Sequence, residues 1–361
     1  RGVECLGRAD VVLYDYLVNP QVLKHAAARA ELVCLGRHGK GRVWPQEAVN
    51  ERLLAEARAG KTVVRLKGGD PAIFARAAEE TAALTAAGID FEVVPGITAA
   101  LAASSYAGIS LTHRDAASAV ALVTGHESDK QELALDYRAL AAFPGTLVFY
   151  MGVTSAEHWA SELISAGKSA ATPAVIVRHC SWPDQRSIRC TLGTVAEVVS
   201  GQKIRPPALV IVGDAAGVDT GDDWFTRRPL FGVKVMVTRP REQADSLRCL
   251  LSELGADVLL QPAIEISPPE DWQPVDAALR RLQEFDWLVF SSVNGVEHFL
   301  GRLCAEHGDL RLLGGVRLAA IGPGTADELA KYRLRANVVP PAFRAEALAD
   351  ALAREVAGRR V

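Results

Sequence analysis

Short runs of β-branched and other apolar residues alternate along the chain with longer stretches rich in Ala, Leu and Glu. This alternation is typical of βα units around a largely parallel sheet, because each strand leads into a helix that brings the chain back to the same edge. The pattern therefore predicts an α/β protein. In the first part of the chain it predicts strands at 11–14, 32–35, 62–66 and 91–94 and helices at 46–59, 73–87 and 98–107.

The same alternation begins again after residue 110. It predicts strands at 119–124, 146–150, 174–178 and 208–212, with helices at 132–142 and 155–166. Residues 213–232 are rich in Gly and Asp, carry Pro229 and show no periodicity, which is typical of a linker. Beyond them the pattern predicts strands at 233–238, 257–260, 286–290, 316–321 and 336–339, and helices at 242–254, 274–282, 295–303, 326–332 and 345–356. We expect an N-terminal α/β lobe at 1–110, a second α/β lobe at 111–218, a linker at 219–232 and a third α/β domain at 233–361.

Composition narrows the functional classes. A chain that is 49% hydrophobic and 23% charged is globular rather than disordered. Its formal charge of -3 provides no overall basic field for nucleic acid or an anionic membrane, so an anionic ligand needs a local cluster of cations. The six cysteines form no C-x-x-C pair, which argues against a metal site or a disulfide framework and fits the reducing cytoplasm. No apolar run has the length of a membrane-spanning helix, and the first residues lack a signal-peptide pattern.

Two loops carry the first chemical signal. In VVRLKGGDPAIFAR, Gly68 and Gly69 follow a predicted strand, and Asp70 stands at a helix-capping position. Glycines admit a ligand close to the backbone, although the same residues also make a good tight turn. In VVPGITAALAASSYAGI, a Pro-Gly turn precedes Thr98, which can cap a helix of small residues. Two such loops in sequential units predict a shared pocket at the carboxyl ends of the strands. Neither is a G-x-G-x-x-G motif, so a nicotinamide cofactor is not indicated.

Several motifs then agree in order and spacing. LKGGDPAIFARAAEE, VVPGITAALAASSYAGISLTHRD, LVTGHES, LVFYMGV and PDQR resemble the uroporphyrinogen-III C-methyltransferases of the adenosylmethionine-dependent tetrapyrrole methylase family, over residues 1–218. The resemblance implies a two-lobed fold with S-adenosyl-L-methionine in the cleft between the lobes. It implies two successive methyl transfers to ring carbons of uroporphyrinogen III, which give precorrin-2, the branch intermediate toward sirohaem and cobalamin. It also implies a homodimer.

The resemblance assigns residues to the cofactor. We expect Asp70 to neutralise the ammonium group of adenosylmethionine or to accept from its polar groups, and Met151 to pack beside the adenosine or the sulfur. The cofactor-binding positions carried over by motif are Gly68, Gly69, Asp70, Ile73, Thr98, Ala99, Met151, Cys180 and Ala208.

A polycarboxylate substrate requires a local concentration of cations. The substrate-binding candidates in this half of the chain are Arg65, Lys67, His113, Arg114, Arg186 and Arg189. Each Arg or Lys alone is also consistent with a solvated surface charge, and His113 with a hydrogen-bonded structural histidine.

Methylation at carbon requires the ring to lose a proton. The resemblance assigns the general base to Asp15, at the end of the strand at 11–14, where an aspartate could also cap a helix. The family's partner acid is a lysine, and Arg37 stands at its place. Because a guanidinium does not release its proton in proteins, we expect Arg37 to act electrostatically, with His38 or Lys40 as alternative proton donors.

The family begins with a strand and a Gly/Pro-rich loop ending in Asp, and this sequence starts after them. We therefore expect the natural protein to be longer, and the polypeptide as written to bind adenosylmethionine poorly or to fold badly.

The third unit carries a second resemblance. VKVMVTRPREQADSLRCLLSELGADVLLQPAIEI, FDWLVFSSVNGVEHF and VRLAAIGPGTADELA resemble the first half of uroporphyrinogen-III synthases, which close hydroxymethylbilane while inverting one terminal pyrrole. We expect Asn294 to cap a helix with Glu297, and the segment 322–325 to open another. The transferable positions are Arg239, Ser291, Ser292, Asn294 and Thr325, of which Ser292 and Asn294 are equally consistent with plain capping. Because the family has two lobes, we expect this domain to be incomplete and to lack synthase activity alone.

The predicted fold is thus a two-lobed tetrapyrrole methylase fold followed by a partial uroporphyrinogen-III synthase-like α/β domain. The predicted activity is adenosylmethionine-dependent methylation of uroporphyrinogen III, with no metal and no nucleic-acid partner. Two alternatives stay open: methylation of another ring carbon by a precorrin methyltransferase, and a non-catalytic tetrapyrrole-binding protein.

Overall fold

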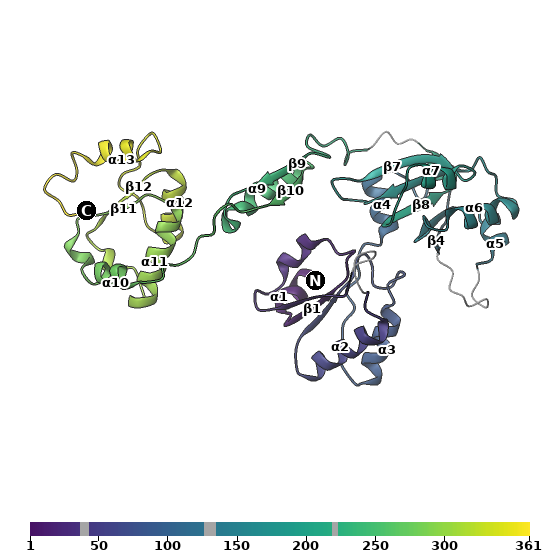
Figure 1. Cartoon of the computed structure of the whole chain (residues 1–361), viewed down its shortest axis with the longest axis horizontal. Coiled ribbons are helices and arrows are strands. Elements are labelled where there is room, and N and C mark those ends of the chain that lie inside the picture. Colours follow the sequence, from purple (N-terminus) through teal and green to yellow (C-terminus); the bar gives the residue numbers. More distant parts are fainter. Residues whose placement is uncertain (37–42, 126–134, 219–222) are drawn as a thin grey trace. The chain divides into compact units, whose positions relative to one another are not determined.

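The computed structural model describes residues 1–36, 43–125, 135–218 and 223–361 (Figure 1). By internal packing it divides into two compact units, residues 1–237 with 246–259 and residues 238–245 with 260–361. The expected domain boundaries follow sequence patterns rather than packing and stay a prediction. No helix in the described part of the chain is both long and apolar enough to cross a membrane.

The first lobe is built on a parallel three-stranded sheet in the order β2-β1-β3. The central strand β1 reads VVLY, and its three aliphatic residues are fully buried because both neighbours and the helices cover it. The elements of this lobe are α1 (Gly2–Arg8), β1 (Val11–Tyr14), η1 (Pro20–His25), β2 (Glu31–Cys34), α2 (Gln46–Arg58), β3 (Val63–Leu66) and α3 (Ala77–Ala86).

Two expected elements of this lobe were wrong. Residues 91–94 form no strand, and Phe91 and Val93 are exposed, because no described strand hydrogen-bonds to them. The helix expected from 73 begins only at Ala77, since Phe74 and Arg76 adopt positive φ values of 50° and 55° that interrupt a right-handed helix.

The second lobe contains a five-stranded sheet in the order β4-β5-β8-β6-β7. Only β4 and β5 are parallel, so the expectation of a largely parallel sheet was wrong here. The cause is that β6 and β7 form a hairpin, and β8 pairs antiparallel with both β5 and β6. The elements are β4 (Val120–Thr124), α5 (Tyr137–Ala142), β5 (Thr146–Tyr150), α6 (Ala156–Ser165), β6 (Pro173–Arg178), β7 (Arg186–Thr191), α7 (Val195–Gly201), β8 (Ala208–Val212) and α8 (Asp214–Gly217).

Helix α4 (Ala99–Ala107) connects the two lobes. It packs on the sheet of the second lobe, where Ala100 and Ala103 are fully buried in one cluster with Val148 and Ile211 (Figure 1). The small side chains allow this close approach of helix and sheet.

Part of the expected linker packs against this helix. Trp224 donates its indole N–H to the carbonyl of Ser105 (2.9 Å), and the buried ring of Phe225 contacts Tyr106. Residues 219–222 of that expected linker lie outside the described residues.

The last third of the chain contains two small sheets, β9 with β10 and the parallel pair β11 with β12. The core of the second unit is formed by Leu279, Val296, Leu300 and Leu329. Residues 336–339 form no strand and make only a single bridge, from Val338 to Ala319. The elements are β9 (Lys234–Val237), α9 (Arg241–Glu253), β10 (Asp257–Leu260), α10 (Gln273–Arg280), η3 (Leu282–Glu284), β11 (Trp287–Phe290), α11 (Val293–His307), η4 (Arg311–Leu313), β12 (Arg317–Ala320), α12 (Pro323–Lys331) and α13 (Ala345–Leu352).

Candidate active site

The two glycine-containing loops lie against each other at the carboxyl end of β3. Asp70 joins them, because its Oδ2 accepts from the backbone N–H of Gly96 (2.9 Å) and its Oδ1 from that of Ala72 (2.8 Å). Both hydrogen bonds lower the pKa of Asp70 and keep its carboxyl group ionised, and the bond from Gly96 has the larger effect. Asp70 is therefore an anion that fixes the relative position of both loops.

Glycine is required in these loops because backbone touches backbone. Gly69 has a φ of +94°, which disfavours any residue with a Cβ. A Cβ on Gly96 would overlap the carbonyl oxygen of Gly69, and one on Gly68 would lie 2.9 Å from the Cβ of Leu17. The glycines therefore allow one loop to approach the other closely, and the predicted close approach of a ligand to them stays a prediction.

Tyr150, the last residue of β5, ties the second loop to the second lobe. Its hydroxyl lies 2.6 Å from Oγ1 of Thr98 and accepts from the backbone N–H of Ala100 (2.9 Å), and its ring contacts that of Phe74 (4.9 Å between centroids). Sequence reasoning missed this residue, although it precedes Met151 in the LVFYMGV motif. Met151 itself is 48% exposed and has a φ of +55°.

Three further cofactor candidates gather around Tyr150. Ile73, Ala99 and Cys180 pack against the same buried cluster, and burial raises the pKa of the Cys180 thiol to about 11. Ala208 begins β8 and packs against the cluster on the other side of the sheet. The structure thus brings together most of the expected positions, while their contact with a cofactor stays a prediction.

Asp15 follows β1 at the same end of the first sheet. Its Oδ1 accepts from the backbone N–H of Leu17 (2.9 Å), which makes a turn, while η1 is capped by Asn19 instead. Oδ2 lies 3.6 Å from Nη2 of Arg65, and about a quarter of the side chain is exposed. The carboxylate is therefore held at one oxygen and accessible.

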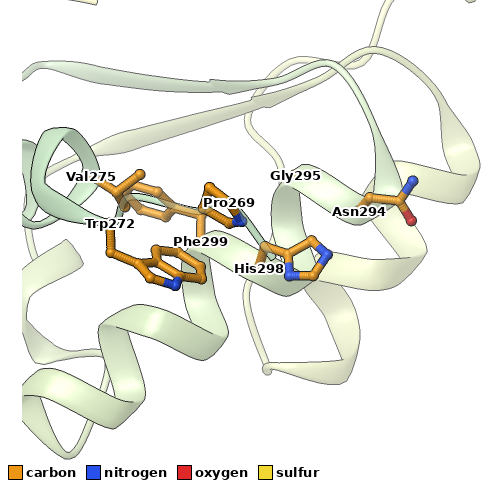
Figure 2. A pocket seen from close by; sticks show the side chains of 7 residues that line it. All are labelled: Pro269, Trp272, Val275, Asn294, Gly295, His298 and Phe299. Atoms are coloured by element: carbon orange, nitrogen blue, oxygen red, sulfur yellow. The ribbon is translucent and has the colours of Figure 1, made fainter. Parts of the chain in front are cut away.

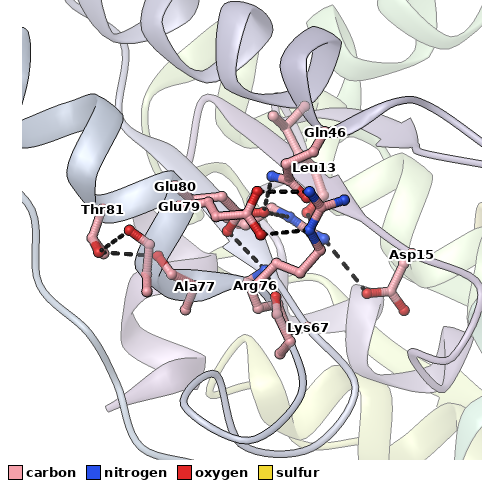
Figure 3. Close-up of polar contacts among 12 residues, drawn as sticks. Leu13, Asp15, Gln46, Lys67, Arg76, Ala77, Glu79, Glu80 and Thr81 are labelled. Carbon is pink, nitrogen blue, oxygen red and sulfur yellow. Dashed lines mark hydrogen bonds and ion pairs between the residues drawn. The ribbon is translucent and has the colours of Figure 1, made fainter. Parts of the chain in front are cut away.

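Arg65 and Lys67 belong to a buried ionic cluster around Glu80, on α3 (Figure 3). Nε of Arg65 lies 3.2 Å from Oε1 of Glu80, and Nζ of Lys67 lies 2.7 Å from Oε2 and 2.6 Å from the carbonyl of Ala75. The side chains of Arg65 and Lys67 are only 16% and 6% exposed. Burial of the ammonium lowers the pKa of Lys67, and the positive charge of the nearby Arg65 lowers it further. Both cations are bonded inside the lobe, and their contact with substrate stays a prediction.

Sequence reasoning also missed Glu80. Three donors converge on its carboxylate: Arg65, Lys67 and, at 3.1 Å, Nε2 of Gln46 from α2. The only signal in the sequence was a second glutamate at the end of the FARAAEE motif.

The other candidates in the second lobe differ in exposure. The side chain of Arg114 is 89% exposed, beside Asp115 at 3.9 Å. His113 bridges to Ala117 through its backbone, and its Nδ1 accepts from the backbone N–H of Asp115 (3.2 Å), which agrees with a structural histidine.

Two arginines of β7 bond to neighbouring segments. Arg186 donates to the side chain of Gln202 (2.6 Å), and Arg189 to the carbonyl of Ala216 (3.1 Å). The expected partner of Asp15 and its alternatives lie outside the described residues: Arg37, His38 and Lys40.

In the synthase-like part, the cap of α11 differs from expectation. Ser292 is the N-cap and accepts from the N–H of Gly295 (3.0 Å), whereas Asn294 lies inside the helix and accepts from Nε2 of Gln243 (2.8 Å). The helix α12 opens at Gly322 as expected, with Thr325 buried. Arg239 and Ser291 are exposed.

A cavity of about 260 Å³ lies beside α11 (Figure 2). Of the expected substrate positions, Asn294 lines it. The other lining residues are mostly apolar: Pro269, Trp272, Val275, Gly295, His298 and Phe299. In the described part of the chain, no group of three His, Cys, Asp or Glu residues could hold a metal ion.

Two family models match the chain. Residues 1–196 match the tetrapyrrole (corrin/porphyrin) methylases, and residues 245–361 match uroporphyrinogen-III synthase HemD. A porphyrin biosynthesis protein HemD of Ruminiclostridium josui is 36% identical over 99% of this chain and 71% of its own length. A uroporphyrinogen-III C-methyltransferase of Bacillus subtilis (strain 168) is 36% identical over 94% of this chain and 70% of its own length.

Solved structures agree with these matches. The uroporphyrin-III C-methyl transferase from Thermus thermophilus, crystallised with S-adenyl homocysteine, is 38% identical with a TM-score of 0.51, over 60% of this chain and 91% of its own. A cobalt precorrin-4 methyltransferase of cobalamin biosynthesis is 29% identical with a TM-score of 0.53, over 59% of this chain and 87% of its own. The chain belongs to the tetrapyrrole methylase family and continues into a region of the uroporphyrinogen-III synthase family.

Proposed function

We propose that this protein transfers methyl groups from S-adenosyl-L-methionine to two ring carbons of uroporphyrinogen III, giving precorrin-2. One observation carries the proposal. Asp70 joins the loops at 68–70 and 95–98, and Tyr150 ties the second loop to the second lobe, in a chain that is 36% identical to a uroporphyrinogen-III C-methyltransferase over 94% of its length.

The residues at these loops fit the methyl donor. Ile97 is 70% exposed and Met151 48% exposed, and they stand next to Thr98 and Tyr150, which are hydrogen-bonded to each other. Exposed apolar side chains beside close-packed backbone suit a flat adenosine, and the ionised Asp70 suits the ammonium group of the amino acid part. When bound, the donor supplies an electrophilic methyl group on a positively charged sulfur.

Asp15 is the base in this proposal. Among the described residues Oδ2 accepts no hydrogen bond, and Nη2 of Arg65 lies 3.6 Å from it, so this oxygen has lone pairs that can accept a proton from the ring. Arg114 and Arg186 are exposed cations that can pair with substrate carboxylates, and we expect Arg37 to act electrostatically.

In the full-length protein, the synthase region converts hydroxymethylbilane to uroporphyrinogen III and so supplies the methyltransferase. The N-termini of α11 and α12, capped at Ser292 and Gly322, offer backbone N–H groups for substrate carboxylates. We place the enzyme in the cytoplasm, because its six cysteines form no C-x-x-C pair and fit a reducing compartment. On the family resemblance we expect it to be a homodimer.

The test is anaerobic incubation of the full-length protein with uroporphyrinogen III and adenosylmethionine, followed by mass spectrometry. We expect a product with two added methyl groups. Asp15→Asn should lower turnover by about 10²- to 10⁴-fold while S-adenosylhomocysteine still binds. The matched surface control is Asp90→Asn, at an exposed residue of the same lobe. Binding of the ring without methyl gain, or methylation of other precorrins only, would contradict the proposal.

A further inference from the structure

The buried cluster of Arg65, Lys67 and Glu80, the Glu80 cluster, lies at the carboxyl end of the first sheet beside Asp15 (Figure 3). Two cations and one anion are buried together in it, and Asp15 is the fourth charge. Buried ion pairs often stabilise a fold little compared with apolar packing, because each charge is desolvated. A gain in fold stability alone therefore does not explain why these charges are buried together.

The donors of Arg65 are nearly all engaged within the lobe. Nη1 donates to the carbonyls of Leu66 (2.8 Å) and Leu13 (3.4 Å), and Nε donates to Glu80 (3.2 Å). Only Nη2 faces Asp15. Arg65 cannot turn to a substrate carboxylate without breaking these buried bonds.

The separation between Arg65 and Asp15 is itself informative. A charge-assisted N–H···O bond measures about 2.7–2.9 Å, whereas Nη2 stays 3.6 Å from Oδ2. At this distance the guanidinium orients the carboxylate by its charge but does not occupy the lone pairs that a base needs. Nε of the same guanidinium lies closer to Glu80, at 3.2 Å from its Oε1.

We propose that Glu80 is a positioning residue, which holds Arg65 so that its guanidinium orients Asp15 without forming a close ion pair with it. Nζ of Lys67 lies 2.7 Å from Oε2, the second carboxylate oxygen of Glu80, and balances its charge. This inference rests on the role of Asp15 as the base in the proposed function.

The first test is Glu80→Gln in the full-length protein, with kcat and KM measured for uroporphyrinogen III. Without the anion, Arg65 closes onto Asp15 and occupies its lone pairs. We expect kcat to fall about ten- to hundred-fold while KM stays within about two-fold. If Arg65 instead binds substrate, its loss of alignment raises KM, and that result would overturn the proposal.

The matched control is Glu56→Gln. Glu56 is also a poorly exposed glutamate of the first lobe that bridges an arginine and a lysine, Arg52 at 2.7 Å and Lys61 at 2.6 Å. Lys61 precedes β3, so this bridge lies at the amino end of the sheet, away from Asp15. We expect kcat within about two-fold of wild type here, because only stability is affected.

Three further variants keep the proposal open to refutation if Glu80→Gln folds poorly. Arg65→Lys keeps the charge but not the fork that bonds several partners, so kcat should fall. Glu80→Asp keeps the anion and should retain more activity than Glu80→Gln. Adding Glu80→Gln to Asp15→Asn should cost nothing more, since both act on one group. Normal kcat in Arg65→Lys, or additive losses in the double variant, would refute the inference.

The same experiments separate this inference from the proposed function. An inactive wild type, or a fully active Asp15→Asn variant, would refute the proposed function. An active wild type with an inactive Asp15→Asn and a normal Glu80→Gln would refute only the role of Glu80. Binding of S-adenosylhomocysteine by each variant verifies that the protein is folded.

Discussion

Removing the hydroxyl of Tyr150 should loosen the start of helix α4. The Tyr150→Phe variant keeps the ring, which contacts Phe74, but loses the acceptor of the Ala100 N–H and the partner of the Thr98 hydroxyl. All three hydrogen-bonded residues are buried, so water does not replace the lost group without local opening.

The size of the effect follows from these two bonds. A buried polar group left without a partner costs about 1–3 kcal/mol. The N–H of Ala100 has a fixed direction and bears the whole cost, whereas the Thr98 hydroxyl can rotate toward another acceptor. We therefore expect a loss of about 1–3 kcal/mol, a large part of the stability of an ordinary domain.

Hydrogen exchange measured by mass spectrometry on peptides from α4 is the suitable assay, because it reports local opening without assuming two-state unfolding. A loss of 2 kcal/mol should accelerate exchange at Ala100 by about 30-fold. Tyr106→Phe is the control, because Tyr106 lies on the same helix α4 and its ring contacts Trp224 and Phe225 instead of the residues at the start of the helix. Exchange within about three-fold of wild type at Ala100 would refute the assigned role of Tyr150.

Three other expected outcomes follow from the same structure. Gly96→Ala should weaken binding of S-adenosylhomocysteine measured by calorimetry and destabilise the lobe by about 1–3 kcal/mol, because its Cβ overlaps the Gly69 carbonyl, whereas Gly201→Ala meets no atom within 4 Å and should be neutral. The lowered pKa of Asp70 adds stability that is present above its unfolded pKa of about 3.9 and is lost as pH falls through the folded value, so Asp70→Asn should flatten acid unfolding followed by circular dichroism. Ser292→Ala should destabilise the second unit by about 1 kcal/mol in urea unfolding, because the cap of α11 is lost. An unchanged midpoint of acid unfolding in Asp70→Asn or of urea unfolding in Ser292→Ala would contradict these expectations. Tight binding of S-adenosylhomocysteine by Gly96→Ala would contradict the first of them.

The sequence predicts those elements whose signal is local. The apolar runs at β1, β5 and β8 are found where expected, because burial of an apolar run depends on adjacent residues. Helix α4 begins after Thr98 as expected, but the Thr98 side chain makes no capping hydrogen bond and bonds the hydroxyl of Tyr150 instead. Strand β7, Arg186–Thr191, is mostly polar and was not predicted, since its place in the sheet depends on the hairpin with β6.

The site shows the same limit. The glycine loops could be predicted from turn chemistry, but the bond between Thr98 and Tyr150 joins residues that are 52 positions apart. From the sequence, Arg65 and Lys67 are candidate substrate contacts that are also consistent with surface charges, and only the fold places them around a buried Glu80. Local patterns therefore identify the loops, and the tertiary structure decides which charges remain available.

The position of α4 also determines when during synthesis this helix can pack in its final place. Its buried face is covered by strands that end at Tyr150 and Val212, far downstream in the chain. A ribosome must have released those strands before the loop ahead of the helix can reach its final shape. The turn that contains Thr98 thus reaches its final structure late in synthesis, after the first lobe has emerged.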